Sequence, residues 1–175
     1  MRRQTVNSQP ARDETSRESL EQEAKFILEE SRMVLPGIQT LLGFQLIAVF
    51  NQGFGEKLSS VQQDLHLFAF VLVAGAMALI MTPAAYHRQA EREQVSEYFV
   101  RTASRLLTAA LVFLMIGISF DAFLVAKIVT GRIGASAGIA VALALLFIGL
   151  WFIFPRVGWR VRHASGYETG HRDTE

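Results

Sequence analysis

Four long apolar blocks alternate with polar segments along the chain. The blocks cover residues 33–50, 65–82, 106–128 and 133–154. A helix rises about 1.5 Å per residue and the hydrocarbon core of a bilayer is about 30 Å thick, so each block is long enough to cross a membrane with little or no tilt. The pattern predicts an all-α protein, a four-helix transmembrane bundle with up-down connections.

The polar segments set the domain boundaries that we expect. Residues 1–16 are predicted to be a disordered tail, residues 17–155 the membrane domain, and residues 156–175 a second polar tail. Within residues 17–32, apolar positions recur with helical spacing. Two arrangements are open for this segment: a helix lying on the membrane surface, or a cytosolic extension of the first membrane helix. We favour the extension because the segment is acidic.

Prolines and capping residues suggest where the helices bend, begin and end. Pro36 removes one backbone hydrogen bond and is predicted to kink the first helix near its start. Pro83 is predicted to end the second helix and to open an amphipathic segment that leads into the third. Ser60 with Gln63 fits a capping box at the start of the second helix.

The basic residues predict the orientation of the chain. Of its 17 Lys and Arg residues, only Lys57, Lys127 and Arg132 lie at or just beyond the end of the first or third block. The others precede the first block, lie between the second and third blocks, or follow the fourth. Cytoplasmic segments carry the excess of positive charge, so both termini are predicted to be cytoplasmic.

Composition narrows the function classes. The chain is 51% hydrophobic with a net charge of +1, which indicates a lipid bilayer and not nucleic acid as its surroundings. It has no cysteine, and its four histidines lack metal-ligand spacing. Phosphate-binding loops are missing from the sequence as well. We therefore expect a protein that is not an enzyme and has no cofactor or metal site.

Small residues recur at positions where helices can approach closely. Gly37 and Gly43 lie in the first block, and Gly134, Gly138 and Ala142 form a stripe in the fourth. Such stripes favour close helix contact in membranes. The sequence leaves two partners open for the stripe: another helix of this chain, or a second copy in a homo-oligomer.

Three blocks each carry a polar residue in the half that we expect to face outward. From the helical rise, Asp121 lies about 6 Å, Gln45 about 5 Å and His66 about 10 Å from the middle of its span. An Asp in mid-membrane costs roughly 2.5–3.5 kcal/mol on insertion scales, so a partner is expected. We predict that these three residues form an intramembrane cluster. It is either a proton relay or a contact that holds helices together.

A second set of polar residues is expected at the cytoplasmic surface. Glu30 and Arg32 precede the first block, and Tyr86, His87 and Arg88 follow the second. Two arginines near one surface can hold a phosphate, so these residues are a candidate docking site for a ligand, a lipid headgroup or a protein partner. The simpler alternative is that they anchor helix ends at the interface.

Two stretches resemble a known family. They are residues 30–46, which include Ser31-Arg32-Met33, Leu35-Pro36-Gly37 and Gly43-Phe44-Gln45-Leu46, and residues 83–88, which read PAAYHR. Together they resemble an uncharacterised group of small bacterial four-helix membrane proteins, known only as a domain of unknown function. The resemblance covers about residues 30–128 and implies a four-span fold in a bacterial inner (plasma) membrane. It implies no activity.

Two functions remain open. The first is a non-enzymatic membrane protein that acts by helix-mediated self-association or partner binding. The alternative is a small proton-linked channel or transporter subunit that uses Gln45, His66 and Asp121.

Overall fold

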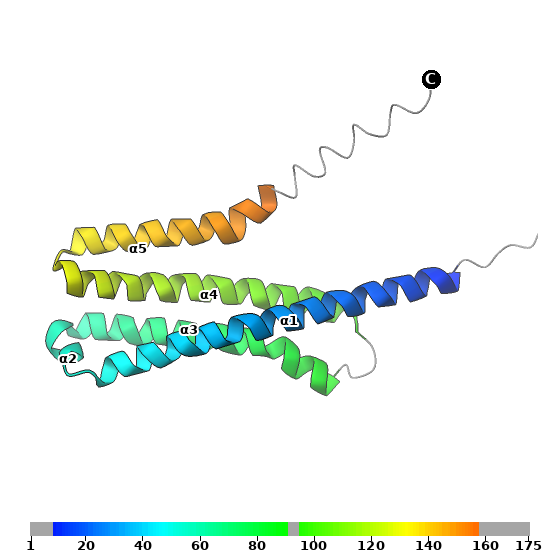
Figure 1. The fold of residues 1–175 in the computed structure, drawn as a ribbon, viewed down its shortest axis with the longest axis horizontal. Helices are drawn as coiled ribbons and strands as arrows, with labels where there is room; N and C mark the ends of the chain where they lie inside the picture. Colours follow the sequence, from blue (N-terminus) through cyan, green and yellow to red (C-terminus); the bar gives the residue numbers. More distant parts are fainter. Residues whose placement is uncertain (1–8, 91–94, 158–175) are drawn as a thin grey trace, which may run out of the picture. The chain divides into compact units, whose positions relative to one another are not determined.

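The computed structural model describes residues 9–90 and 95–157, with side chains from residue 17 onward. This part of the chain is a series of helices without strands (Figure 1). The elements are α1 (Gln9–Phe50), α2 (Gly53–Lys57), α3 (Ser60–Ala90), α4 (Glu97–Thr130), α5 (Ile133–Phe147) and the π-helical turn η1 (Ile148–Ile153).

Four helical segments are long and apolar enough to cross a membrane. They are Arg17–Phe50, Ser60–Ala90, Glu97–Thr130 and Ile133–Val157. Each contains one of the apolar blocks, and the predicted all-α class with four candidate spans is confirmed. Which termini face the cytoplasm stays a prediction, and so does the character of the tails, since residues 1–8 and 158–175 lie outside the described residues.

The first helix is longer than its apolar block. α1 begins at Gln9, inside the segment predicted to be disordered, and continues to Phe50. Residues 17–32 therefore belong to the same helix as the first span and extend it. The helix passes through Pro36, whose carbonyl accepts a hydrogen bond from the Thr40 hydroxyl at 2.8 Å.

The prediction that Pro83 ends the second helix is wrong. Pro83 is fully buried inside α3, which continues to Ala90. Proline removes one helical hydrogen bond but does not stop a helix whose neighbours pack around it. Residues 84–90 therefore extend the second span, and the third begins separately at Glu97.

The cap of α3 lies one residue before the predicted one. The Ser59 N–H donates to Oε1 of Gln62 at 3.0 Å, and the Gln62 N–H donates to the Ser59 carbonyl at 2.9 Å. Gln63 instead donates through Nε2 to the Leu58 carbonyl at 3.0 Å. The side-chain-to-backbone hydrogen bond of a capping box is therefore present, with Gln62 in place of Gln63.

Helices α3 and α4 each contribute to two compact units, which we describe separately. The first unit contains Met1–Gln52 and Phe70–Leu114. Its buried cluster joins the extension of α1 to the start of α4, with members Ala24, Ile27, Phe99, Val100 and Ala103. Further along, a Cβ placed on Gly75 would lie 3.3 Å from the Phe113 ring, so α3 and α4 approach closely there.

The second unit contains Gly53–Ala69 and Met115–Glu175. Its turn between α4 and α5 uses Gly131, whose φ of +67° is a conformation that favours glycine. The Lys127 ammonium donates to the Gly131 carbonyl at 2.9 Å, and the buried Ser136 hydroxyl donates to the Arg132 carbonyl at 2.8 Å. These bonds satisfy backbone carbonyls in and next to the turn.

Candidate functional site

The second unit brings a histidine and a carboxylate together inside the apolar spans. Nδ1 of His66, on α3, lies 3.2 Å from Oδ1 of Asp121, on α4. The side chains are 9% and 18% exposed, respectively. Both residues lie on membrane-length helices, so the contact joins two protonatable groups in surroundings that water reaches poorly.

An aromatic ring covers the histidine. Phe54, on the short helix α2, packs edge-on against the His66 imidazole, with ring centroids 5.2 Å apart and an interplanar angle of 66°. Edge-to-face contacts of this kind are favourable for aromatic rings. The helix α2 therefore has a local role, because it carries the ring that limits the space around His66. The sequence did not predict this contact, because the glycines on both sides of Phe54 are typical of a turn.

Gln45 belongs to the other unit. It lies on α1, where it is 4% exposed. The second unit brings His66 and Asp121 together, and the prediction that Gln45 joins them stays a prediction. The chemistry of the pair does not need Gln45, because an imidazole and a carboxylate can exchange a proton by themselves.

A groove between α1 and α3 of the first unit gathers most of the second predicted set. Its volume is about 600 Å³. Ser31 and Arg32 line it from α1, and Thr82, His87 and Arg88 line it from α3. The remaining lining side chains are apolar: Leu28, Leu35, Ala78, Ile80, Met81, Ala84 and Ala85. We call this cavity the arginine groove. It joins the two sequence stretches on which the family resemblance rests.

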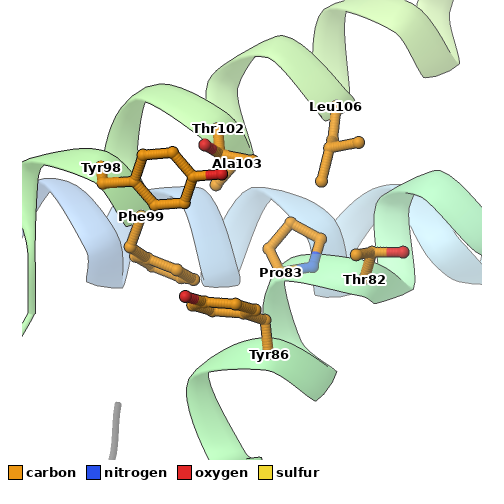
Figure 2. A pocket seen from close by; sticks show the side chains of 8 residues that line it. All are labelled: Thr82, Pro83, Tyr86, Tyr98, Phe99, Thr102, Ala103 and Leu106. Atoms are coloured by element: carbon orange, nitrogen blue, oxygen red, sulfur yellow. The ribbon is translucent and has the colours of Figure 1, made fainter. Parts of the chain in front are cut away.

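Tyr86 lines a different and smaller pocket (Figure 2). That pocket has a volume of about 70 Å³. The Tyr86 ring stacks on Phe99, with centroids 5.9 Å apart and planes inclined by 17°. His87, the next residue, also contacts Phe99, at 5.6 Å between centroids. Phe99 therefore contacts two consecutive residues of α3, which its position in an amphipathic pattern did not predict.

Glu30 does not join the arginine groove. It is exposed on α1 and absent from the groove lining. The predicted cytoplasmic set is thus reduced to Arg32, His87 and Arg88 around one cavity.

The predicted packing glycines lie open within the described chain. A Cβ placed on Gly37, Gly43, Gly134 or Gly138 would meet nothing within 4 Å. Ala142 is exposed on the same helix as the last two. A side chain at any of these four glycines would therefore meet open space, and the partner of the stripe on α5 stays a prediction. The close approach occurs at Gly75 instead, although no small residue lies four positions before or after it in the sequence.

No metal centre is found among the described residues, since no three His, Asp or Glu side chains there are grouped to hold an ion. The chemistry available in this region is therefore that of the pair, the arginine groove and the open helix faces.

Comparison with known proteins places the chain in a family. The model of the DUF6328 family, a family of unknown function, matches residues 13–155, and the chain belongs to this family. The match reaches further than the resemblance seen in the sequence, because it includes the fourth span. Neither the curated proteins nor the solved structures contain a match to the chain.

Proposed function

We propose that this member of the DUF6328 family is a non-enzymatic protein of a bacterial inner membrane and acts as a small proton-linked channel or transporter subunit. The observation that carries the proposal is the 3.2 Å contact between His66 and Asp121 on two membrane-length helices. A carboxylate and an imidazole in contact can pass a proton from one to the other, and such groups within spans build proton relays.

Energetics favour a chemical role for the pair over a purely structural one. A carboxylate in mid-membrane costs roughly 2.5–3.5 kcal/mol on insertion scales. A polar contact between membrane helices returns about 0.6 kcal/mol on average and about 1.7 kcal/mol at most. Apolar side chains in place of both His66 and Asp121 would therefore hold the helices at lower cost. The carboxylate is better explained by what it can bind and release.

The test is proton flux through liposomes that contain the purified protein and a trapped pH-sensitive dye. After a pH step, wild-type protein is expected to dissipate the gradient faster than protein-free liposomes. Asp121→Asn keeps the size and polarity of the side chain but cannot release a proton, so its flux should fall to the protein-free level. Asp64→Asn is the matched control, because the same change is made at an exposed position on α3.

Two outcomes would contradict the proposal: wild-type flux no greater than in protein-free liposomes, or full flux through Asp121→Asn. Equal loss in Asp64→Asn would show that a general change of charge, and not the pair, is responsible.

A second candidate function is self-association through α5. The observation that favours it is the open space at Gly134 and Gly138, on a helix whose most apolar window has 0% of its positions buried. Small residues allow two helix backbones to approach closely in lipid. A homo-oligomer is also compatible with transport, since one bundle of four helices encloses no wide pore.

Chemical crosslinking in detergent tests this candidate. Wild-type protein should give a discrete oligomer, and Gly138→Leu should reduce it. Gly37→Leu is the matched control, because the same substitution fills open space on α1. Equal oligomer yields from both variants would refute association through the α5 stripe. A discrete oligomer without proton flux would favour association alone as the function.

A further inference from the structure

Three aromatic side chains line one small pocket of the first unit, near the end of α3 and the start of α4 (Figure 2). Tyr86 belongs to α3, whereas Tyr98 and Phe99 belong to α4. We call this cavity the aromatic pocket. Its volume is about 70 Å³, which is far below the roughly 300–1,000 Å³ of pockets that enclose a drug-sized molecule. The aromatic pocket therefore fits one compact chemical group, with the rest of a larger molecule outside.

The ring of Tyr86 is held in place by its stacking contact. It lies on Phe99, with 5.9 Å between the ring centroids and 17° between the planes. Phe99 is 2% exposed and belongs to the buried cluster of the first unit, so it gives Tyr86 a fixed support. Figure 2 shows the two rings nearly edge-on, with Tyr98 and Leu106 on the side toward which one face of each ring points. Because the rings are already fixed, a ligand that binds there loses little affinity to ordering them.

The rest of the pocket wall is mostly carbon. Pro83, Ala103 and Leu106 line it with apolar atoms. The Thr82 hydroxyl, which also lies in the wall, donates its proton to the Ala78 carbonyl within α3 at 2.8 Å. A primary ammonium group has three N–H donors that need acceptors, so it matches such a wall poorly. A group whose surface consists of methyl groups matches it well.

Aromatic rings differ from leucines in the electrostatics of their faces. The face of a ring carries partial negative charge and attracts a cation that lies within about 6 Å of the ring centroid. An uncharged apolar group would gain little in the aromatic pocket, because lipid tails solvate it equally well. A methylated cation gains an attraction that lipid tails cannot supply. Rings and carbon walls together therefore favour a quaternary ammonium group.

The aromatic pocket lies at the border of the apolar blocks. Thr82 is the last residue of the second block and Leu106 is the first residue of the third, and both line the pocket. Tyr86 and Tyr98 lie beyond these ends, on the polar extensions of the two spans. Aromatic residues often anchor helices at this level of a membrane. Anchoring alone requires no pocket between them, whereas binding of a headgroup or a solute does.

We propose that the aromatic pocket binds a quaternary ammonium group. Tyr86 and Tyr98 contact the group through their rings, and Phe99 positions Tyr86. The chemistry is the same whether a free solute or a lipid headgroup carries the group, and no charged side chain takes part. The inference goes beyond the proton-linked function and does not depend on it, since the aromatic pocket and the His66–Asp121 pair share no residue.

The experiment is equilibrium binding of radiolabelled choline to the purified full-length protein in a maltoside detergent, which contains no ammonium group. Saturable binding is expected. The uncharged carbon analogue of choline, in which a tert-butyl group replaces the trimethylammonium group, serves as one competitor. It has the same shape without the charge, so it should displace choline about tenfold less effectively than unlabelled choline does. Short-chain phosphatidylcholine serves as the second competitor.

The double variant Tyr86→Leu/Tyr98→Leu keeps apolar bulk in the pocket but removes two ring faces, so choline binding should weaken about tenfold. Tyr86→Phe/Tyr98→Phe keeps the rings and should bind like the wild type, which separates the rings from their hydroxyl groups. The matched control is Phe26→Leu/Phe44→Leu. It removes two rings of the same unit outside the pocket, at positions 62% and 67% exposed, and its binding should equal that of the wild type.

Four results would overturn the proposal: no saturable binding of choline, equal displacement by the carbon analogue, wild-type affinity in the leucine variant, or an equal loss in the control variant. A loss in the phenylalanine variant as large as in the leucine variant would overturn the role of the rings.

The second competitor identifies the source of the group. Stronger displacement by phosphatidylcholine than by unlabelled choline assigns the group to a lipid headgroup, and the reverse order assigns it to a free solute. Neither readout depends on proton flux, so failure here leaves the proton-linked proposal to its own test.

Discussion

The span formed by α4 and the span Ile133–Val157, which begins with α5, are both apolar enough to cross a membrane, yet they differ in what covers them. In the most apolar 18-residue window, 33% of the positions are buried inside the protein for the α4 span and 0% for the span Ile133–Val157. Helix α4 also makes specific contacts, such as that of Asp121 with His66 and the close approach of the Phe113 ring to Gly75. In α5 the small residues Gly134 and Gly138 face open space.

The difference teaches that apolarity alone does not indicate contact in a membrane protein. Lipid tails solvate leucine as well as another helix does, so an apolar face is at no disadvantage when it stays uncovered by protein. Contacts are instead fixed where a polar group needs a partner or where a missing side chain lets two backbones approach. Four tests examine this view, and we order them from the largest expected effect to the smallest.

Gly75→Leu should destabilise the protein most. The first added carbon would lie 3.3 Å from Phe113, and the rest of the side chain has to displace that ring or separate α3 from α4. Overpacking of this kind costs about 1–3 kcal/mol. Chemical unfolding in detergent, followed by circular dichroism, measures the change. Gly138→Leu adds the same atoms in open space and should leave monomer stability unchanged; a comparable loss there would show that α5 is packed like α4.

The His66–Asp121 contact should give a coupling free energy of about 0.6–1.7 kcal/mol in a double-mutant cycle. Asp121→Leu leaves the buried imidazole without its carboxylate and should reduce the free energy of unfolding. His66→Leu should act likewise, and the double variant should cost less than the sum of the two. Strictly additive effects would mean that the two side chains do not stabilise each other.

Ser136→Ala should cost about 0.5–1 kcal/mol, the value of one buried hydrogen bond. Ser136 is the buried residue of α5, and its hydroxyl bonds to the Arg132 carbonyl at 2.8 Å and lies 3.3 Å from the Thr130 hydroxyl. The same unfolding experiment measures the loss. No change in stability would indicate that the start of α5 is held by the backbone turn at Gly131 alone.

Glu97→Gln should have the smallest effect, about 0.3–0.5 kcal/mol. Its carboxylate pairs with Arg101 at 3.2 Å, but both side chains are largely exposed, at 70% and 74%. Added salt should remove the difference between variant and wild type, because exposed pairs are screened. A loss larger than that of Ser136→Ala would contradict the ranking of buried over exposed contacts.

The sequence predicted the number of spans well because the apolar blocks are long and their boundaries are polar. The position of the helix ends was harder to predict. Pro83 was expected to end α3, and only the packing of neighbours around it, which no local pattern encodes, explains why the helix continues to Ala90. The cap at Ser59 was missed by one residue because Ser59 and Ser60 offer the same hydroxyl.

The candidate sites, like the helices, were predictable from the sequence only in part. Residue type and expected depth pointed to Asp121, His66, Arg32 and Arg88. Ionisable side chains are costly inside a membrane, and arginines mark its cytoplasmic side. The covering ring of Phe54 and the double contact of Phe99 were not predictable. Aromatic residues are frequent in this chain, and their sequence positions do not say which of them contact a polar side chain. The glycine pattern marked helices that can approach others, without showing which of them do.

The central claim is that the chain crosses the membrane four times and carries the His66–Asp121 pair inside it. The sequence has no cysteine, so each introduced cysteine is the only thiol in the protein that a maleimide can label. Intact cells producing Glu29→Cys, Lys57→Cys, Ala90→Cys, Arg132→Cys or Arg156→Cys are treated with an impermeant maleimide. The account predicts labelling of the cysteines at 57 and 132 alone, with those at 29, 90 and 156 labelled only after lysis. Labelling of 29 or 156 in intact cells would contradict it.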